Sequence, residues 1–167
     1  MPFFQQLSSG ESVFLDANTL VYHFQPHPVY GGACSQLLTR IDQQDLRGYT
    51  STHVLSELAH RLMMVEASTL PGWTASKVKL RLRQNPAALS NLSQFRMAID
   101  AILQSRITVL TITPSLIASA AAVSQQYGLL SNDALMVVVM QSQGLTNLAS
   151  SDTDFDRVPG IIRHVPA

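Results

Sequence analysis

Four acidic residues stand beside apolar segments, where an unpaired charge is unfavourable. Asp16 interrupts the apolar run VFLDANTLVY, and Glu57 lies inside the helical pattern HVLSELAHRLMM. Asp133 directly precedes the stretch ALMVVVM, and Asp152 closes the run LTNLASSD. Charged residues make up only 13% of the chain and the basic ones lie mostly in other segments, so ion pairing is a poor explanation for these acids. A buried carboxylate must be paired, protonated or bound to a metal, and we therefore expect a shared metal site.

Carboxylates that surround one hollow suit a hard cation. Mg²⁺ and Mn²⁺ prefer oxygen ligands in octahedral geometry and keep several waters. A bound ion can acidify a water molecule to make a nucleophile, and it can stabilise charge on a phosphoryl group. The chain contains no Walker loop, G-x-S-x-G elbow, H-E-x-x-H or C-x-x-C motif. The four acids are therefore its strongest candidates for chemistry.

The elements that must position these acids alternate between strands and helices. The expected strands cover 12–16, 46–50, 107–112, 145–150 and 161–165. The expected helices cover 33–44, a segment capped by Ser51 or Thr52, 73–84, 87–105, 114–127 and a segment capped by Ser131 or Asn132. Alternation of the basic residues within 77–83 would also permit a strand there. Such a pattern predicts a parallel sheet covered by helices on both faces.

Ligands of parallel sheets bind at the carboxyl ends of the strands. Asp16 and Asp152 fall at the carboxyl ends of the first and fourth expected strands, and Glu57 and Asp133 fall in the first turns of helices. We therefore expect all four acids at one edge of the sheet. Simpler explanations exist for single residues: the helix dipole favours Asp133, and turn capping explains the aspartates that follow Asp152.

Length and composition predict one compact domain over residues 1–167 with a substantial core, since 46% of the residues are hydrophobic. The formal net charge is zero, but basic residues gather in one segment. That segment is either a solvated helix face or a place for an RNA backbone, through Lys77, Lys79, Arg81 and Arg83. The single cysteine, Cys34, excludes an internal disulfide. With no expected signal peptide or membrane span, we expect a cytoplasmic protein.

The acidic motifs, taken in order, resemble those of the PIN-domain nucleases over nearly the whole chain. FLDANTLVY resembles the opening strand with its first aspartate, and SELAHRL resembles the glutamate element. LLSNDALMVVVMQSQGL resembles the third acidic element. LASSDTDFDRVPGI is similar to the closing T-x-D-x-D-F element, with Ser150 at the threonine position. Within this family, the chain looks most like the VapC-type toxins of bacterial toxin–antitoxin pairs.

This resemblance implies a three-layer α/β/α sandwich with a central parallel sheet and Mg²⁺- or Mn²⁺-dependent cleavage of RNA. It implies that Asp16 and Asp133 hold the main ion, while Glu57 and Asp152 complete the site or orient the attacking water. Hydrogen-bonding groups around these ligands would be Asn18, Ser150 and Asp154. The resemblance also implies a homodimer and an antitoxin whose segment covers the acidic groove.

Three other interpretations remain open at this stage. The string DANTL also resembles the opening motif of haloacid-dehalogenase-type phosphatases, although Asn18 stands where their catalytic acid would be. Glu57 and His60 have the spacing of a di-iron ligand pair, but no second pair is present. A binding module with the same fold and no turnover is the non-enzymatic alternative, and metal-dependent RNA cleavage would distinguish the two.

Overall fold

A computed structural model describes residues 1–167, and its centre is a five-stranded sheet in which every neighbouring pair is parallel. The bounds of the strands are β1 Ser12–Leu15, β2 Arg47–Ser51, β3 Thr108–Leu110, β4 Asn147–Ala149 and β5 Ile162–His164. Four of the five strands lie within the segments predicted from the sequence, and β2 extends one residue beyond its predicted segment, to Ser51. The predicted α/β fold with a central parallel sheet is therefore confirmed.

The strand order, β3-β2-β1-β4-β5, reverses direction beside β1. The chain builds β2 and then β3 on one side of β1, and later adds β4 and β5 on the other side. The neighbouring strands β1 and β4 are almost entirely buried and mostly apolar, as expected of strands covered on both faces. In open parallel sheets, ligands bind outside the carboxyl ends of the strands at such a reversal. The topology therefore singles out the ends of β1 and β4.

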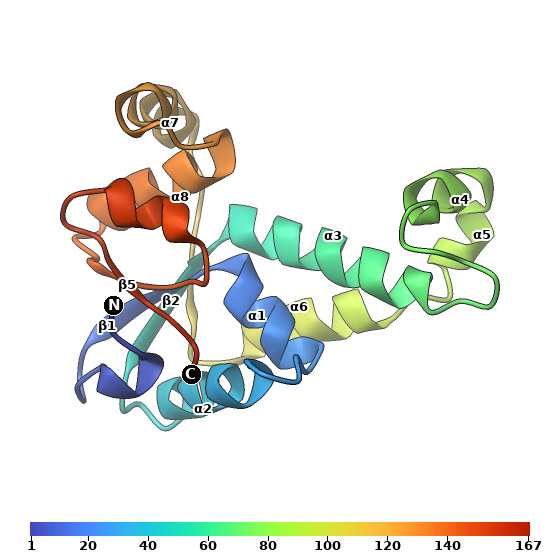
Figure 1. Ribbon diagram of the computed structural model, residues 1–167, viewed down its shortest axis with the longest axis horizontal. Helices are drawn as coiled ribbons and strands as arrows, with labels where there is room; N and C mark the ends of the chain where they lie inside the picture. The colour runs from blue at the N-terminus through green and yellow to red at the C-terminus, as the bar shows by residue number, and fades with distance from the viewer.

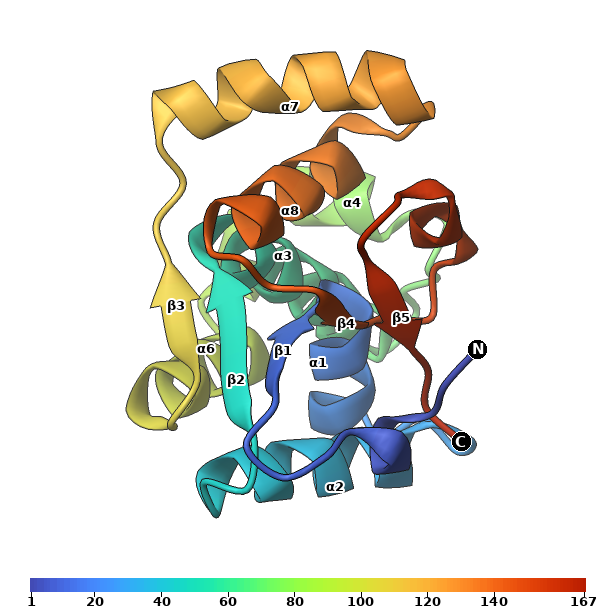
Figure 2. The same cartoon turned by 90° about the vertical axis from the view of Figure 1, so that its left-hand side faces the viewer.

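The helices occupy both sides of this sheet (Figure 2). Helices α1, α3 and α6 lie together behind it, α2 runs along the amino ends of the strands, and α7 packs on α8 near the carboxyl ends. Their bounds are α1 Ala17–Phe24, α2 Gly31–Asp42, α3 Thr52–Ser68, α4 Val78–Gln84, α5 Pro86–Leu89, α6 Gln94–Gln104, α7 Pro114–Tyr127 and α8 Ser131–Ser142. Two 3₁₀ helices, η1 Phe4–Gln6 and η2 Thr153–Arg157, complete the chain.

Local signals explain several helix ends. The Ser51 hydroxyl accepts from the backbone N–H of Val54, so Ser51 is the cap of the two residues predicted for α3. The Thr113 hydroxyl accepts from the backbone N–H of Leu116 at the start of α7. Gly128 ends α7 with φ +65°, a left-handed conformation that suits glycine. The prediction that Ser131 or Asn132 caps α8 is wrong, because α8 already begins at Ser131 after the extended residue Leu130.

Residues 69–93 form an arm at the far end of α3, away from the sheet (Figure 1). The predicted helix over 73–84 is shorter, since α4 starts at Val78, and the alternative strand is absent. The predicted helix over 87–105 is divided into α5 and α6. A small cluster separate from the main core holds the arm on α3, through Ala67, Val78, Leu82 and Leu92. None of the helices combines the length and apolar composition needed to cross a membrane.

Candidate active site

The four predicted acids line one hollow of about 370 Å³ at the carboxyl ends of β1 and β4. Asp16 directly follows β1, and Asp152 lies three residues beyond the end of β4. Glu57 projects from the second turn of α3 and Asp133 from the first turn of α8. Four separate segments therefore deliver one carboxylate each to the point where the strand order reverses.

Asp16 is the most buried of these acids, with only 3% of its surface exposed. Its backbone N–H donates to the carbonyl of Ala149 at 3.2 Å, which extends the pairing of β1 with β4. Its Oδ2 accepts from the Ser150 hydroxyl at 2.7 Å and from the Asn18 amide at 3.2 Å. Burial raises the pKa of Asp16, whereas the bond from Ser150 opposes that shift. Oδ1 has no side-chain donor and can accept a ligand.

Asp133 experiences the charge of the whole group. Its pKa is raised to about 6, mainly by burial, then by the nearby Asp152 and Asp16 carboxylates, with smaller contributions from Asp154 and Glu57. Carboxylates that repel each other in this way favour a cation bound between them, because its positive charge would offset the repulsion. The electrostatics of the hollow therefore match an ion site.

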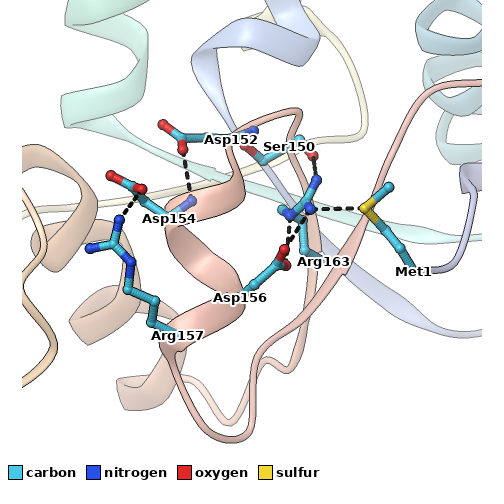
Figure 3. Close-up of polar contacts among 7 residues, drawn as sticks. All are labelled: Met1, Ser150, Asp152, Asp154, Asp156, Arg157 and Arg163. Carbon is cyan, nitrogen blue, oxygen red and sulfur yellow. Dashed lines mark hydrogen bonds and ion pairs between the residues drawn. The ribbon is translucent and has the colours of Figure 1, made fainter.

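The segment after β4 is held by hydrogen bonds that Figure 3 displays. The Ser150 hydroxyl accepts from the N–H of Asp152 at 3.0 Å, and Asp152 Oδ1 accepts from the N–H of Asp154 at 2.9 Å. Asp154 is paired with Arg157, and it does not line the hollow. Asp154 therefore supports the turn that carries Asp152, and the simpler interpretation as a turn residue fits its contacts.

Arg163 of β5 holds the same segment from the opposite side (Figure 3). Its side chain is 3% exposed. Its Nε and Nη2 donate to the two carboxylate oxygens of Asp156 at 2.8 Å each, and Nη1 lies 3.5 Å from the Ser150 carbonyl. The guanidinium thus joins the two ends of the segment that contains Asp152. No spacing in the sequence indicates that Arg163 and Asp156 form an ion pair.

Arg61 is a site residue that the sequence interpretation missed. It lines the hollow, its Nη1 donates to Asn18 Oδ1 at 2.6 Å, and the same nitrogen lies 3.5 Å from Glu57 Oε1. The expectation that ion pairing plays little part was therefore wrong for Glu57. The spacing of four residues between Glu57 and Arg61 on a helix is a readable signal for such a pair. The other newly found lining residues are Leu130, Asn132 and Met136.

The donor set fits a hydrated divalent cation. No three acidic, histidine or cysteine side chains are grouped tightly enough to hold an ion alone. Mg²⁺, however, usually keeps several waters and uses one or two carboxylates. Among the acids of the hollow, Asp16 and Asp133 are the two whose burial and repulsion best fit that requirement.

The remaining candidates lie outside the hollow. Lys77, Lys79, Arg81 and Arg83 belong to the start and body of α4 on the arm. Arg81 lies over the ring of Trp73, with the guanidinium 5.9 Å from the ring centroid. Glu57 and Ser68 are eleven residues apart on α3, which corresponds to roughly 16 Å between the hollow and the base of the arm. His60 is an exposed helix residue.

Comparisons with known proteins identify the family of the chain and structures with a similar fold. The PIN domain family matches residues 13–161, whereas no curated protein sequence matches the chain. Solved structures that share its fold include the following three. VapBC2 from Rickettsia felis, bound to a DNA fragment from its promoter, has a TM-score of 0.61 and 17% identity, covering 93% of this chain and 99% of that chain. VapC20 from Mycobacterium tuberculosis, described as a toxin that cleaves the sarcin–ricin loop, has a TM-score of 0.61 and 18% identity, covering 86% and 92%. A toxin–antitoxin complex from Klebsiella pneumoniae has a TM-score of 0.52 and 20% identity, covering 90% and 95%.

Proposed function

Because the chain belongs to the PIN domain family, we propose that it is a metal-dependent endoribonuclease and the toxin of a type II toxin–antitoxin pair. The observation that carries the proposal is the set of four carboxylates from four segments around one hollow at the strand reversal. The proposed catalytic unit is one PIN-like domain over residues 1–167. The structural likeness to VapC-type toxins supports the choice of a toxin.

In the proposed reaction, water adds to the phosphorus of an RNA phosphodiester, one P–O ester bond breaks, and the departing ribose oxygen takes up a proton. Asp16 and Asp133 would hold Mg²⁺ or Mn²⁺, which when bound acidifies the water and stabilises charge on the phosphoryl oxygens. Glu57 and Asp152 would orient the water or hold a second ion. Asn18 and Ser150 keep the Asp16 carboxylate in one orientation.

The proposed partners are an RNA substrate, a cognate antitoxin and a second copy of the chain, in the cytoplasm. Two observations support an antitoxin: the acidic hollow is open to solvent, and similar folds occur in toxin–antitoxin complexes. Expression of the chain alone should arrest bacterial growth, and the Asp16→Asn variant should not. Normal growth with abundant folded wild-type protein would count against the toxin role.

The nuclease itself is tested with purified, partner-free protein and structured RNAs, with Mg²⁺, with Mn²⁺ and with a chelator. Asp16→Asn is the test variant. Asp45→Asn is the control, because Asp45 pairs with Arg40 beyond the amino ends of the strands. Cleavage that needs metal, persists in Asp45→Asn and disappears in Asp16→Asn supports the proposal. Metal-dependent cleavage that survives Asp16→Asn would assign the activity to a contaminant or to another site. No cleavage by wild-type protein that binds the metal would favour the binding module.

A further inference from the structure

Arg61 is the only basic residue that lines the acidic hollow. It reaches the hollow from α3, one turn after Glu57. Its side chain is 37% exposed, so the guanidinium remains accessible to a ligand. An anionic substrate that enters a hollow lined by four carboxylates meets repulsion, and a fixed positive charge at the same place would offset part of it.

The hydrogen bonds of Arg61 leave most of its donors unused. Nη1 donates to Asn18 and lies near Glu57, and Nε and Nη2 make no hydrogen bond. Arg163 gives the opposite case, because its Nε, Nη1 and Nη2 all contact protein groups. The free Nε and Nη2 of Arg61 form the planar fork that matches two oxygens of a carboxylate or a phosphate.

We propose that Arg61 is a catalytic residue that binds two non-bridging oxygens of the scissile phosphate through Nε and Nη2. This inference rests on the proposed nuclease function. Nη1 keeps its bond to Asn18 Oδ1, and the Asn18 amide group donates to Asp16 Oδ2 at 3.2 Å. The phosphate contact is therefore connected, through one amide, to the most buried acid of the site. In the transition state the same fork would face the charge that develops on the phosphoryl oxygens.

The test compares Arg61→Gln and Arg61→Lys with the control Arg47→Gln. Arg47 lies at the amino end of β2 and donates to the carbonyl of Gly10, on the edge of the sheet opposite the hollow. Two quantities are measured: kcat and KM for a structured RNA with Mg²⁺, and the equilibrium binding of a labelled single-stranded RNA in chelator at several salt concentrations. The binding measurement does not depend on turnover.

Arg61→Gln should lower kcat/KM by about 100-fold and reduce the slope of log K against log salt by about 0.7, the loss of one phosphate contact. Arg61→Lys should have the same salt slope as wild type but a kcat/KM about tenfold lower, because a point charge replaces the planar fork of donors. Arg47→Gln should stay within about twofold of wild type in both measurements.

An Arg61→Gln variant that matches Arg47→Gln in both measurements overturns the inference. A loss of kcat with an unchanged salt slope also overturns the phosphate contact and makes Arg61 a positioning residue for Asn18. Failure of the wild-type chain to cleave any RNA would refute the proposed nuclease instead. In that case a reduced salt slope of Arg61→Gln would still support the contact with phosphate.

Discussion

The hydroxyl of Ser150 donates to Oδ2 of Asp16 at 2.7 Å, although the two residues are 134 positions apart in the sequence. Ser150 is fully buried. The same hydroxyl oxygen accepts from the backbone N–H of Asp152 at 3.0 Å. One side chain therefore sets the position of the acid after β1 relative to the segment that carries the acid after β4.

Ser150→Ala should lower nuclease activity and metal affinity by about 10- to 100-fold, because groups that orient a ligand carry effects of that size. It should also lower the free energy of unfolding by about 2 kcal/mol, since a buried carboxylate loses a donor. Ser150→Thr keeps the hydroxyl and should retain most of the activity. Kinetics, calorimetric Mg²⁺ titration and urea unfolding measure these effects.

The control for this prediction is Ser142→Ala. The Ser142 hydroxyl likewise donates a hydrogen bond, but to the backbone carbonyl of Val139, at the end of α8 that is remote from the hollow. Equal losses of activity in Ser150→Ala and Ser142→Ala would show that the Ser150 hydroxyl has no specific role in the site.

Asp133→Asn should stabilise the metal-free protein at pH 8. The pKa of Asp133, about 6, lies above the ordinary value of 3.8, so ionising this group above pH 6 costs free energy in the folded state. After allowance for solvent screening, the gain in free energy of unfolding is about 1 kcal/mol. In Mg²⁺ the wild type should become the more stable of the two proteins, because the ion stabilises the wild type more than the variant.

Thermal unfolding in chelator and in Mg²⁺ checks this expectation. Asp100→Asn is the control, because Asp100 is an exposed residue of α6 outside the hollow. Should Mg²⁺ raise the Tm of Asp133→Asn as much as that of wild type, Asp133 would not be a ligand of the ion.

Replacing Lys77, Lys79, Arg81 and Arg83 together with Gln should weaken the binding of long RNAs and flatten its salt dependence. The physical reason is that each phosphate contact of a single strand contributes about 0.7 to the salt slope. Fluorescence anisotropy with an RNA of about twenty nucleotides measures the slope. Because the arm lies roughly 16 Å along α3 from the hollow, the binding of a trinucleotide should not change. An unchanged slope for the long RNA would place its backbone elsewhere.

Asp156→Asn should make the protein less stable at neutral pH and less sensitive to acid. Hydrogen bonds from Arg163 hold the pKa of Asp156 below its ordinary 3.8. Above pH 3.8 this carboxylate therefore stabilises the fold, and that contribution is lost as the pH falls through its lowered pKa. Unfolding by urea at pH 7 and at pH 3 should show a smaller difference for the variant than for the wild type.

The matched control is Asp45→Asn, which removes a similar partner from the half-buried Arg40 and also has a lowered pKa in the wild type. Asp45→Asn should change stability alone, whereas Asp156→Asn should also reduce nuclease activity through the segment that carries Asp152. Equal activities of the two variants would mean that the Arg163 contact does not position Asp152.

Much of this site could be predicted from the sequence because its signals are local. An apolar run marked β1, Ser51 marked a helix start, and Asp16 follows its strand directly. Parallel strands must place their carboxyl ends at one edge, so acids at strand ends could be brought together by topology alone. The length of α4 was less predictable, because Val78 and Leu82 of α4 pack with Ala67 of α3 in the small cluster that is separate from the main core.

The sequence by itself determined the class of fold and which carboxylates meet. Only the tertiary structure decided the strand order, with its reversal between β1 and β4, and the side-chain pairs that link distant segments. Arg61 reaches Asn18 from another helix, and the buried Arg163 side chain donates to Asp156 on the other side of a turn. Such pairs follow from the packing of whole elements against a common core, and no periodicity in the sequence encodes that packing.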